Sequence, residues 1–574
     1  MLYQFSKGNR QDFKNYRPVS LLPICGKIFE RLIYNSVFNF IDERKLLSPN
    51  QSGFKPQDSC VHQLLSITNS IYSSFDCNPS LEVRGVFLDI SKAFDKVWHD
   101  GLLLKIKSFG ISGNLLILIQ SFLCNRMQRV VLNGQCSDWM KISAGVPQGS
   151  ILGPLFFLIY INDLPQGLQS DVKMFADDTC LFSIIQDKTS SANALNSDLE
   201  KISNWAVQWK MSFNPDPSKQ AAELLFSRKR GSEHHPDLIF NGTVVNKVTH
   251  QKHLGVILDK KLSFTEHIKQ AIAKSIKGLN VIRKLNHTLP RKTLITIYKS
   301  FIRPHLDYGD VIYDQPSNKS FANKIESIQY NCALAITGAI KGTSREKLYR
   351  ELGLEYLVQR RWFRRLSYFY RINSSKLPHY LFQLIPTISH NYLTRNVNIP
   401  PLRCRTNFYS DSFIPYSIKE WNNIDPDVRN LTSYTAFRKY LLKMIRPSPN
   451  NLYGVHDPVG LKLLTRIRLS LSHLREHKFR HNFQDTVNPL CTCSLEIEDT
   501  NHFFLRCLNF STCRTTLLNE LNIIEPSLIS LNDNEFVEIL IFGNPNFSND
   551  INQKILKCTI SFLKNTKRFD DPLF

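Results

Sequence analysis

Two adjacent carboxylates stand out as candidates for chemistry in this sequence. Asp177 and Asp178 lie between two short runs, residues 171–174 and 179–184, in which apolar residues alternate. This alternation predicts half-buried strands, which we expect to meet at a tight turn carrying both aspartates. Aspartate is also common in turns for purely structural reasons, so the pair alone does not establish a chemical role.

A third carboxylate strengthens the chemical interpretation. Asp89 ends the apolar run 85–88, and a carboxylate at the end of a buried strand is costly unless something compensates it. If both sites lie on neighbouring strands, charges about 4 Å apart repel by about 4 kcal/mol at an effective dielectric of about 20. Divalent cations relieve this repulsion, and oxygen-only ligands select hard ions such as Mg²⁺. Asp89, Asp177 and Asp178 therefore suit two-metal phosphoryl transfer.

Three ordered motifs carry a resemblance to a known family. They are Phe-Leu-Asp-Ile-Ser-Lys-Ala-Phe-Asp at 87–95, Ala-Gly-Val-Pro-Gln-Gly-Ser-Ile-Leu-Gly-Pro at 144–154 and Phe-Ala-Asp-Asp at 175–178. The sequence resembles reverse transcriptases of non-LTR (LINE-like) retrotransposons, especially the jockey-type group, most strongly from Asn15 to Arg371. This implies an α+β right-hand polymerase with fingers, a palm with an antiparallel sheet and a helical thumb.

The resemblance assigns roles to the three aspartates and to a nearby aromatic ring. Asp89, Asp177 and Asp178 would hold two Mg²⁺ ions, one helping to activate a primer 3′-hydroxyl and the other stabilising the pyrophosphate leaving group. Phe94 would be a steric gate that clashes with a ribose 2′-hydroxyl. The alternative is a core phenylalanine on an amphipathic helix, which we expect to follow Asp89.

Two lysines are expected at the phosphates of the incoming nucleotide. Lys55 stands where the family usually has an arginine that contacts the triphosphate, and lysine keeps the charge without the bidentate fork. Lys219 matches by position a lysine near the departing pyrophosphate, where it could donate a proton. The segment Pro215-Asp216-Pro217 departs from the family's loop. For both lysines the alternative is an exposed side chain without this role.

The loop of residues 145–154 and a later hairpin would complete the site. Glycine at 149 lets a backbone approach a ligand closely, and the Gln148 amide can donate and accept at a sugar or template base. In the resembled family both lie beside the nucleotide and template. The resemblance also implies a nucleotide contact at Ile90 and a primer grip at His253, Leu254 and Gly255.

The charge balance points to a polyanionic partner. The net charge is +23, and residues 260–380 hold 23 basic and 8 acidic residues. From Phe264 the pattern turns helical, which we interpret as a thumb gripping the phosphate backbone, and the arginine-rich run 360–365 is expected to extend this basic surface. Solvated helix faces are the alternative; interleaved aromatic residues favour nucleic acid.

Thirteen scattered cysteines do not resemble a disulfide scaffold, so we expect a reducing compartment. Four late residues form a separate constellation: Cys491, Cys493, His502 and Cys507. Three thiolates and an imidazole suit structural zinc, with free buried thiols as the alternative because the Cys-x-Cys opening is unusually tight. Similar clusters lie near the C-termini of many relatives in the resembled family, where they are thought to bind RNA.

We expect three regions: reverse transcriptase fingers and palm at 1–258, a basic helical thumb and connection at 259–380, and a mostly helical C-terminal region with the zinc site at 381–574. The longest apolar stretch, 151–161, contains Gly153-Pro154 and is shorter than the about 20 residues that span a bilayer. We find no signal-peptide pattern either, and expect no membrane partner and a location in cytoplasm and nucleus.

The resemblance implies an RNA-directed DNA polymerase that extends a DNA 3′-hydroxyl on an RNA template. Its partners would be the RNA template, a DNA primer or nicked target DNA, and dNTPs. We expect the endonuclease domain that usually begins the family's full-length proteins to be absent from this chain. The alternative is a truncated or host-retained copy that binds nucleic acid without catalysis.

Overall fold

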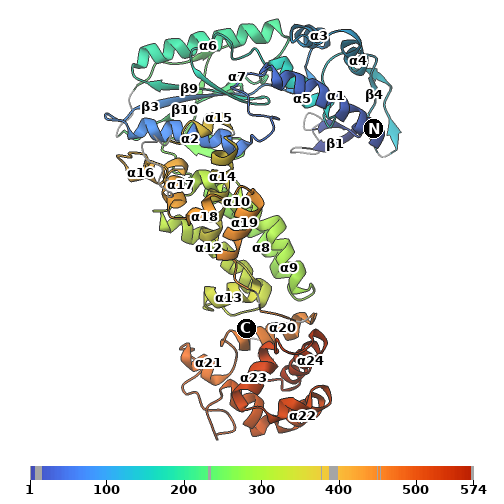
Figure 1. Ribbon diagram of the computed structural model, residues 1–574, viewed down its shortest axis with the longest axis vertical. Helices are drawn as coiled ribbons and strands as arrows, with labels where there is room; N and C mark the ends of the chain where they lie inside the picture. The colour runs from blue at the N-terminus through green and yellow to red at the C-terminus, as the bar shows by residue number, and fades with distance from the viewer. Residues whose placement is uncertain are drawn as a thin grey trace. The chain divides into compact units, whose positions relative to one another are not determined.

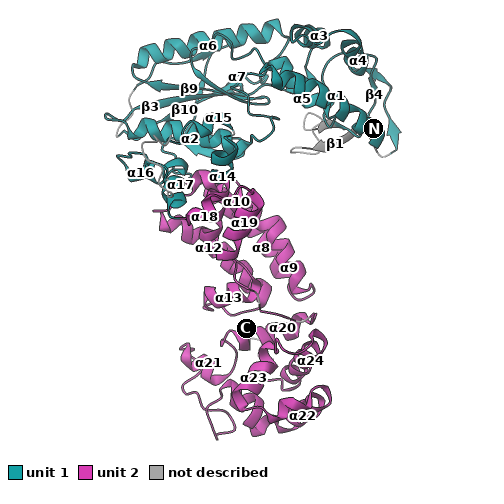
Figure 2. Cartoon of the chain, viewed as in Figure 1, with its two compact units in different colours: residues 1–264, 369–423 teal, residues 265–368, 424–574 magenta. Residues whose placement is uncertain are grey.

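A computed structural model of the chain shows two compact units (Figure 2). The first unit comprises residues 1–264 and 369–423, and the second comprises 265–368 and 424–574. The structure describes these residues: 2–6, 16–132, 134–229, 234–376, 378–386, 398–448, 450–452 and 454–569.

A five-stranded sheet forms the centre of the first unit. Its strands, in spatial order, are β13 (Asn246–Lys247), β10 (Ala221–Phe226), β3 (Glu82–Leu88), β9 (Asp178–Ile185) and β8 (Asp171–Phe175). Neighbours are antiparallel except β10 and β13. The strands expected around 85–88, 171–174 and 179–184 are therefore confirmed.

Helices cover both faces of this sheet. In Figure 1, α6 (Lys188–Gln208) lies on one side and α2 (Cys60–Asp76) on the other. All seven residues of β3 are buried, as expected for a strand covered on both faces. Asp187 caps the start of α6 by accepting the Ser190 N–H.

The apolar run 151–161 forms α5 (Leu152–Ile161), which is buried at every position except the half-buried Pro154. It packs in one core with parts of α1 (Ile24–Glu43), α3 (His99–Ser108), α4 (Gly113–Leu123) and α6.

Short elements complete the first stretch of this unit. Among the described residues, five strand pairs lie outside the main sheet. Four of them are β1 (Leu2–Ser6) with β2 (Tyr16–Ser20), β4 (Met127–Gln128) with β7 (Met140–Lys141), β5 (Val131–Leu132) with β6 (Gln135–Cys136), and β11 (Ile239–Phe240) with β12 (Thr243–Val244). The fifth pair is the hairpin of β14 (His250–His253) and β15 (Val256–Asp259). Two short helical elements, a 3₁₀ turn at Ala93–Asp95 and α7 at Pro217–Gln220, also belong to this part of the unit.

The second stretch of the first unit packs on α2. It contains α15 (His379–Phe382), α16 (Asn407–Ser410) and α17 (Phe413–Asn422). The Asp76 carboxylate at the end of α2 accepts hydrogen bonds from the N–H groups of Arg405 and Thr406. Phe408 packs edge-on against Tyr72 at 4.8 Å. This stretch is therefore fastened to α2 by both polar and aromatic contacts.

All the helices and strands assigned among the described residues of the second unit are helices. Its first helices are α8 (Thr265–Leu285), α9 (Arg291–Ile297), the π-helical turn η3 (Tyr298–Ile302), α10 (Arg303–Asp307), α11 (Asp310–Tyr313), α12 (Lys319–Thr337), α13 (Arg345–Leu352) and the start of α14 (Leu357–Ser375). The helical pattern expected from Phe264 is confirmed as α8.

After residue 424 the second unit continues with more helices. They are α18 (Pro426–Arg429), α19 (Tyr434–Ile445), α20 (Pro458–Arg468), α21 (Arg475–Arg480), η4 (His502–Arg506), η5 (Leu508–Phe510), α22 (Ser511–Ile524), η6 (Pro526–Ser530), α23 (Asp533–Phe542) and α24 (Asn549–Asn565). Parts of α20 and α22 to α24 share a second hydrophobic core.

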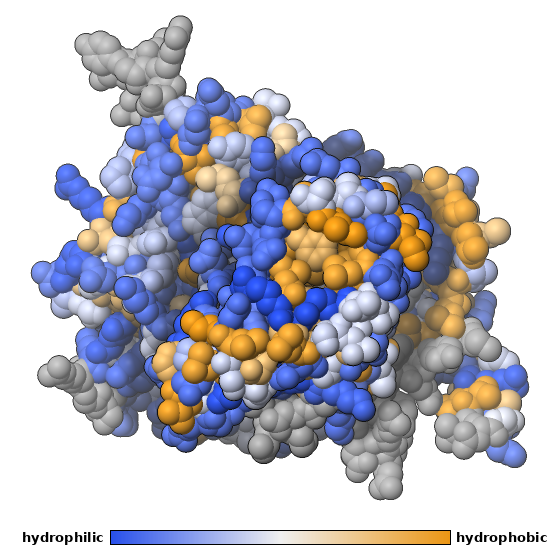
Figure 3. All heavy atoms as spheres, turned by 90° about the horizontal axis from the view of Figure 1, so that it is seen from below, coloured by the Kyte–Doolittle hydropathy of each residue, from blue (hydrophilic) through white to orange (hydrophobic). Residues whose placement is uncertain are grey.

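The surface of these C-terminal helices mixes hydrophobic and hydrophilic side chains, as the face nearest the viewer in Figure 3 shows. Val487, Leu508 and Ile523 are among its exposed apolar residues. Across the described ranges, none of the helices combines the length and apolar character needed to cross a membrane.

The expectation that residues 360–365 extend a basic surface is wrong. Arg361 and Arg365 are each 4% exposed, and all four arginines of the run make ion pairs with nearby acids. The pairs are Arg361 and Arg365 with Asp314, Arg364 with Asp310, and Arg360 with Asp307 and Glu355. A count of net charge could not reveal these pairings, because the acids lie about fifty residues earlier in the chain or just before the run.

Candidate active site

A two-residue turn carries Asp177, one of the three aspartates. Strands β8 and β9 pair Phe175 with Asp178, so Ala176 and Asp177 form the turn between them. Ala176 has φ +54°, in a region that glycine normally occupies at the first central position of such hairpin turns. A non-glycine residue in this conformation needs support from its surroundings.

The register of the sheet brings the third aspartate to the same edge. Strands β3 and β9 pair Leu88 with Thr179, so one further step along both strands places Asp89 opposite Asp178. Asp89 and Asp178 are exposed and Asp177 is half-buried. The condition set in the sequence analysis, that both carboxylate sites lie on neighbouring strands, is therefore met.

Their oxygens stand apart in this structure. Within the described residues, the one group of His, Cys, Asp or Glu with ligand atoms mutually within 4.8 Å is a cysteine–histidine cluster in the second unit. Separation suits carboxylates that share one edge of a sheet, because like charges repel one another. As exposed oxygen donors on one sheet edge, the aspartates fit hard divalent ions such as Mg²⁺ in chemical type.

Asn214 holds Asp89 in place, a contact that the sequence reasoning missed. The Asn214 Nδ2 atom donates to Asp89 Oδ2 at 2.7 Å, and the Asn214 N–H donates to the Asp89 carbonyl at 3.0 Å. The Asp89 N–H in turn donates to the carbonyl of Gln220 at 3.0 Å. Asp89 is thereby fixed at the backbone and at one carboxylate oxygen.

Gln51 supports the strained turn and was also missed as a site residue. This side chain is 3% exposed, and its Oε1 accepts the N–H of Ala176 at 2.9 Å and of Gly53 at 2.8 Å. A Cβ at Gly53 would lie 2.4 Å from the Ala176 nitrogen, so only glycine fits there. Ser52 adds an N–H bond to the Met174 carbonyl at 2.9 Å. The string Gln51-Ser52-Gly53 was the available signal.

Phe94 lies at the edge of the core, in the 3₁₀ turn Ala93–Asp95 where an α-helix was expected. Its half-buried ring stacks on Phe157 at 4.4 Å and meets Phe54 edge-on at 6.2 Å. Its carbonyl accepts the Val146 N–H at 2.8 Å, which ties the loop of residues 145–154 to it. Its role as a steric gate stays a prediction, because the ring is both packed and partly accessible.

Gln148 and Gly149 have structural partners of their own. The Gln148 Nε2 donates to Asp95 Oδ1 at 2.8 Å, and its carbonyl accepts the Ser20 N–H at 2.7 Å. Gly149 has φ +95°, and a Cβ there would lie 2.7 Å from the Ser20 oxygen. The close approach that requires this glycine is therefore made by β2, although a nucleotide had been the expected reason.

Ile90 contributes to the core. Its side chain is 5% exposed, and it forms a backbone bridge with Phe213. Any nucleotide contact at this position is therefore left to the backbone.

Both candidate phosphate-binding lysines have protein partners. Lys55 Nζ donates to the Ser48 carbonyl at 2.7 Å, and burial lowers the pKa of Lys55. Lys219 lies on α7 and pairs with Asp216 at 2.8 Å; their hydrogen bond raises the pKa of Lys219 and lowers that of Asp216 to about 2. Lys219 directly precedes Gln220, the backbone partner of Asp89. The roles of both lysines stay predictions.

The expected primer grip is a tight hairpin packed on the central sheet. Leu254 and Gly255 connect β14 and β15 with φ +45° and +84°, as a type I′ turn requires. The His253 ring lies 5.2 Å from that of Phe87, and its Nε2 lies 3.6 Å from Cys180 Sγ. Phe87 and Cys180 face each other on β3 and β9, so the hairpin rests on the strands that lead to Asp89 and from Asp178. Burial lowers the pKa of His253 to about 4.

The predicted zinc ligands converge in the second unit. The Sγ atoms of Cys491 and Cys507 lie 3.5 Å apart, and Cys493 Sγ lies 3.3 Å from His502 Nε2. Tetrahedral zinc with bonds of about 2.3 Å to sulfur would separate two thiolates by about 3.8 Å. Glu496 lies 3.2 Å from His502 Nδ1 and leaves Nε2 facing the cluster. The arrangement fits structural zinc in ligand type, number and spacing.

Comparisons with known proteins agree with the motifs. Residues 6–258 match the family described as reverse transcriptase (RNA-dependent DNA polymerase). Over 339 residues, the chain is 34% identical to the RNA-directed DNA polymerase from mobile element jockey of Drosophila melanogaster. This alignment covers 57% of this chain and 36% of that protein. It is 32% identical over 370 residues to the probable RNA-directed DNA polymerase from transposon X-element of the same organism, covering 62% of this chain and 39% of that one.

A solved structure of apo telomerase from Candida tropicalis aligns over 63% of both chains at 12% identity and a TM-score of 0.34. The chain spans less than two fifths of the jockey relative's length.

Residues 6–258 therefore match a reverse transcriptase domain, and the relatives that the chain resembles are RNA-directed DNA polymerases. Within this class, the expected kinship with non-LTR retrotransposon reverse transcriptases of the jockey type is confirmed. The domain's mixed helices and largely antiparallel sheet agree with the palm of a right-hand polymerase.

Proposed function

We propose that this protein extends a DNA 3′-hydroxyl primer on an RNA template by two-metal nucleotidyl transfer. The observation that carries the proposal is the register of β8, β9 and β3, which assembles Asp89, Asp177 and Asp178 on one edge of the sheet. These carboxylates would hold two Mg²⁺ ions, which activate the attacking hydroxyl and stabilise the leaving group when bound.

The surrounding residues position the reactants. Asn214 orients the Asp89 carboxylate, and Gln51 keeps the aspartate turn in its strained conformation. The β14–β15 hairpin would hold the primer end, because His253 anchors it to the strands that carry the aspartates. Lys55 and Lys219 would exchange their present protein partners for phosphate oxygens. RNA template, DNA primer or nicked target DNA, and dNTPs are the proposed partners, which would place the protein in cytoplasm and nucleus.

Primer extension with the purified full chain tests this function. A DNA primer annealed to RNA should be extended with dNTPs and Mg²⁺, and a chelator should stop synthesis. Binding of the primed template without any incorporation would instead support the alternative, a copy that binds nucleic acid without catalysis. The three intact carboxylates favour the catalytic function over this alternative.

We also propose that Cys491, Cys493, His502 and Cys507 bind one structural zinc ion. The support is their convergence, with all four ligand atoms mutually within 4.8 Å. Elemental analysis of the full chain, purified under reducing conditions, should give one zinc per molecule, and about none in Cys507→Ser. Equal zinc in both proteins, or none in either, would contradict this assignment and leave the polymerase proposal intact.

A further inference from the structure

One short loop carries several parts of the proposed nucleotide site. Residues 51–58 lead from the central sheet to the start of α2, and three of their side chains face groups already described. Gln51 holds the N–H of Ala176 at the aspartate turn, the ring of Phe54 meets that of Phe94, and Lys55 is the candidate triphosphate contact. The position of this loop therefore matters for metal, sugar and phosphate alike.

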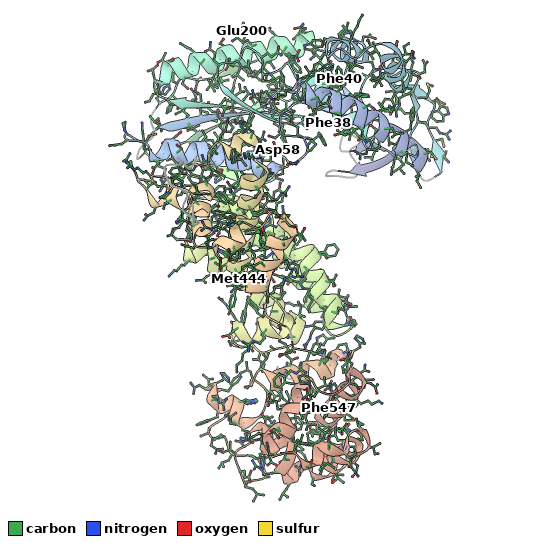
Figure 4. The ribbon with its side chains drawn as sticks, in the orientation of Figure 1. Phe38, Phe40, Asp58, Glu200, Met444 and Phe547 are labelled. Atoms are coloured by element: carbon green, nitrogen blue, oxygen red, sulfur yellow. The ribbon has the colours of Figure 1, made fainter. Side chains whose placement is uncertain are left out.

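A tyrosine from a distant part of the chain bonds to both ends of this loop. The Tyr380 hydroxyl, on α15, donates to Asp58 Oδ1 at 2.7 Å and lies 3.4 Å from Ser52 Oγ. Figure 1 shows α15 beside α2, and Asp58, which lies two residues before the start of α2, is labelled in Figure 4. Burial raises the pKa of Tyr380, so the hydroxyl keeps its proton and can donate.

Each end of the loop is fastened in turn to a rigid element. Ser52 is 4% exposed, and its N–H donates to the carbonyl of Met174 on β8 at 2.9 Å. Asp58 Oδ1 also accepts the N–H of Ser59, the residue that caps α2. One hydroxyl thus joins the strand before the aspartate turn to the start of the helix beneath the sheet.

We propose that Tyr380 is a positioning residue for nucleotide incorporation, which holds the loop of residues 51–58 in the conformation that binds the incoming dNTP. This inference rests on the proposed polymerase function. Tyr380 acts through Ser52 and Asp58 and does not itself contact the reacting atoms. Its position outside the matched family segment, residues 6–258, explains why motif analysis could not find it.

Removal of one oxygen tests the proposal. Tyr380→Phe keeps the ring and loses the hydroxyl, so the loop should spend less time in its binding conformation. Loss of a hydrogen bond to a charged group predicts a rise of about tenfold or more in the KM for dNTPs. The kcat at saturating dNTP should change less than threefold, because bound nucleotide restores the loop.

The matched control is Tyr409→Phe. Tyr409 lies on α16, in the same second stretch of the first unit, and its hydroxyl faces the side chain of Ser73 on α2. A merely structural role of this stretch predicts equal effects for both variants. The positioning role predicts that the KM for dNTPs rises in Tyr380→Phe alone.

Hydrogen–deuterium exchange supplies a readout that does not need activity. The amides of Ser52, Gly53 and Ala176 should exchange faster in Tyr380→Phe than in the parent and in Tyr409→Phe. Unchanged exchange at these amides would overturn the inference even if the parent extends no primer. Faster exchange with an unchanged KM for dNTPs would overturn the link to nucleotide binding. A parent that extends no primer would contradict the proposed function alone, and exchange would then decide whether Tyr380 holds the loop.

Discussion

Asp177 sits at the tip of the turn between β8 and β9, where its carboxylate adds one of the three charges that suit divalent metal. We predict that Asp177→Asn abolishes Mg²⁺-dependent primer extension, since it removes a charged ligand. Folding should persist because removing a like charge relieves repulsion. Single-turnover extension measures the activity, and thermal unfolding measures the fold.

A graded comparison comes from Asn214, which holds Asp89 from outside the metal site. Loss of such an outer partner typically costs about 10- to 100-fold in activity or metal affinity. Asn214→Ala should therefore fall between the parent and Asp177→Asn. Full activity in folded Asp177→Asn would show that Asp177 is not a metal ligand.

Phe94 tests a single ring against a single hydroxyl. Because its ring is partly accessible at the edge of the core, we predict that it excludes ribonucleotides by steric clash. Overlap in a packed site costs about 1 to 3 kcal/mol. Phe94→Val should raise the use of rNTPs relative to dNTPs by about 5- to 150-fold, at 1.4 kcal/mol per tenfold. The measurement is kcat/KM for dCTP and rCTP in both proteins.

The stack of Phe94 on Phe157 gives the competing outcome. If the ring serves only packing, Phe94→Val loses stability and activity with both nucleotides, and the ratio between them stays the same. A folded variant with an unchanged ratio would assign Phe94 to the core.

At the scale of elements, the β14–β15 hairpin links stability to pH through His253. Burial lowers the pKa of this histidine from 6.5 to about 4, so the unfolded chain binds a proton more readily than the folded one between these values. Stability from this group is therefore present above about pH 6.5 and is lost as pH falls toward 4. At 1.36 kcal/mol per pKa unit, lowering the pH from 7 to 5 should cost about 2 kcal/mol.

The variant His253→Phe isolates this effect, because it keeps a ring against Phe87 and removes the titrating group. Unfolding at pH 7, 6 and 5 should show about 2 kcal/mol less acid destabilisation in the variant than in the parent. His250→Phe is the control, since His250 is exposed on the same strand. Parallel pH profiles for parent and His253→Phe would contradict the assignment.

The same scale shows how far the sequence could predict the fold and the site. Alternating apolar residues were sufficient for β8, β9 and their turn, because strand periodicity is a local signal. The supports of the site were not predictable in this way. Gln51 and Asn214 act through contacts with residues over a hundred positions away in the sequence. Tyr380 contacts Asp58 from the second stretch of the first unit, residues 369–423. Such pairings depend on the folded chain.

For the whole molecule, net charge gave a wrong prediction of the nucleic-acid surface, because a count of charges does not show which basic residues form ion pairs. The arginines at 360–365 looked like nucleic-acid contacts by count, whereas Arg361 is 4% exposed and bonds Asp314 at 2.9 Å. The lysines of α8 differ, because Lys274 and Lys277 are exposed one turn apart. A positive charge contributes to phosphate binding only if it is accessible, so the second unit's nucleic-acid surface should follow exposed lysines of α8.

This contrast yields a prediction for the whole protein binding a primed RNA template. Replacing both Lys274 and Lys277 by Gln should reduce the slope of log binding constant against log salt by about 2, as each neutralised phosphate contributes about 0.9 on duplex DNA. Arg361→Gln should leave that slope unchanged and lower the free energy of unfolding by up to about 3 kcal/mol, because it breaks a buried ion pair while Arg365 still compensates Asp314. Binding titrations at several salt concentrations, together with unfolding of each variant, separate the two effects. The prediction would be contradicted if the salt slope fell in Arg361→Gln and stayed unchanged in the double lysine variant. The nucleic-acid surface would then lie on α14.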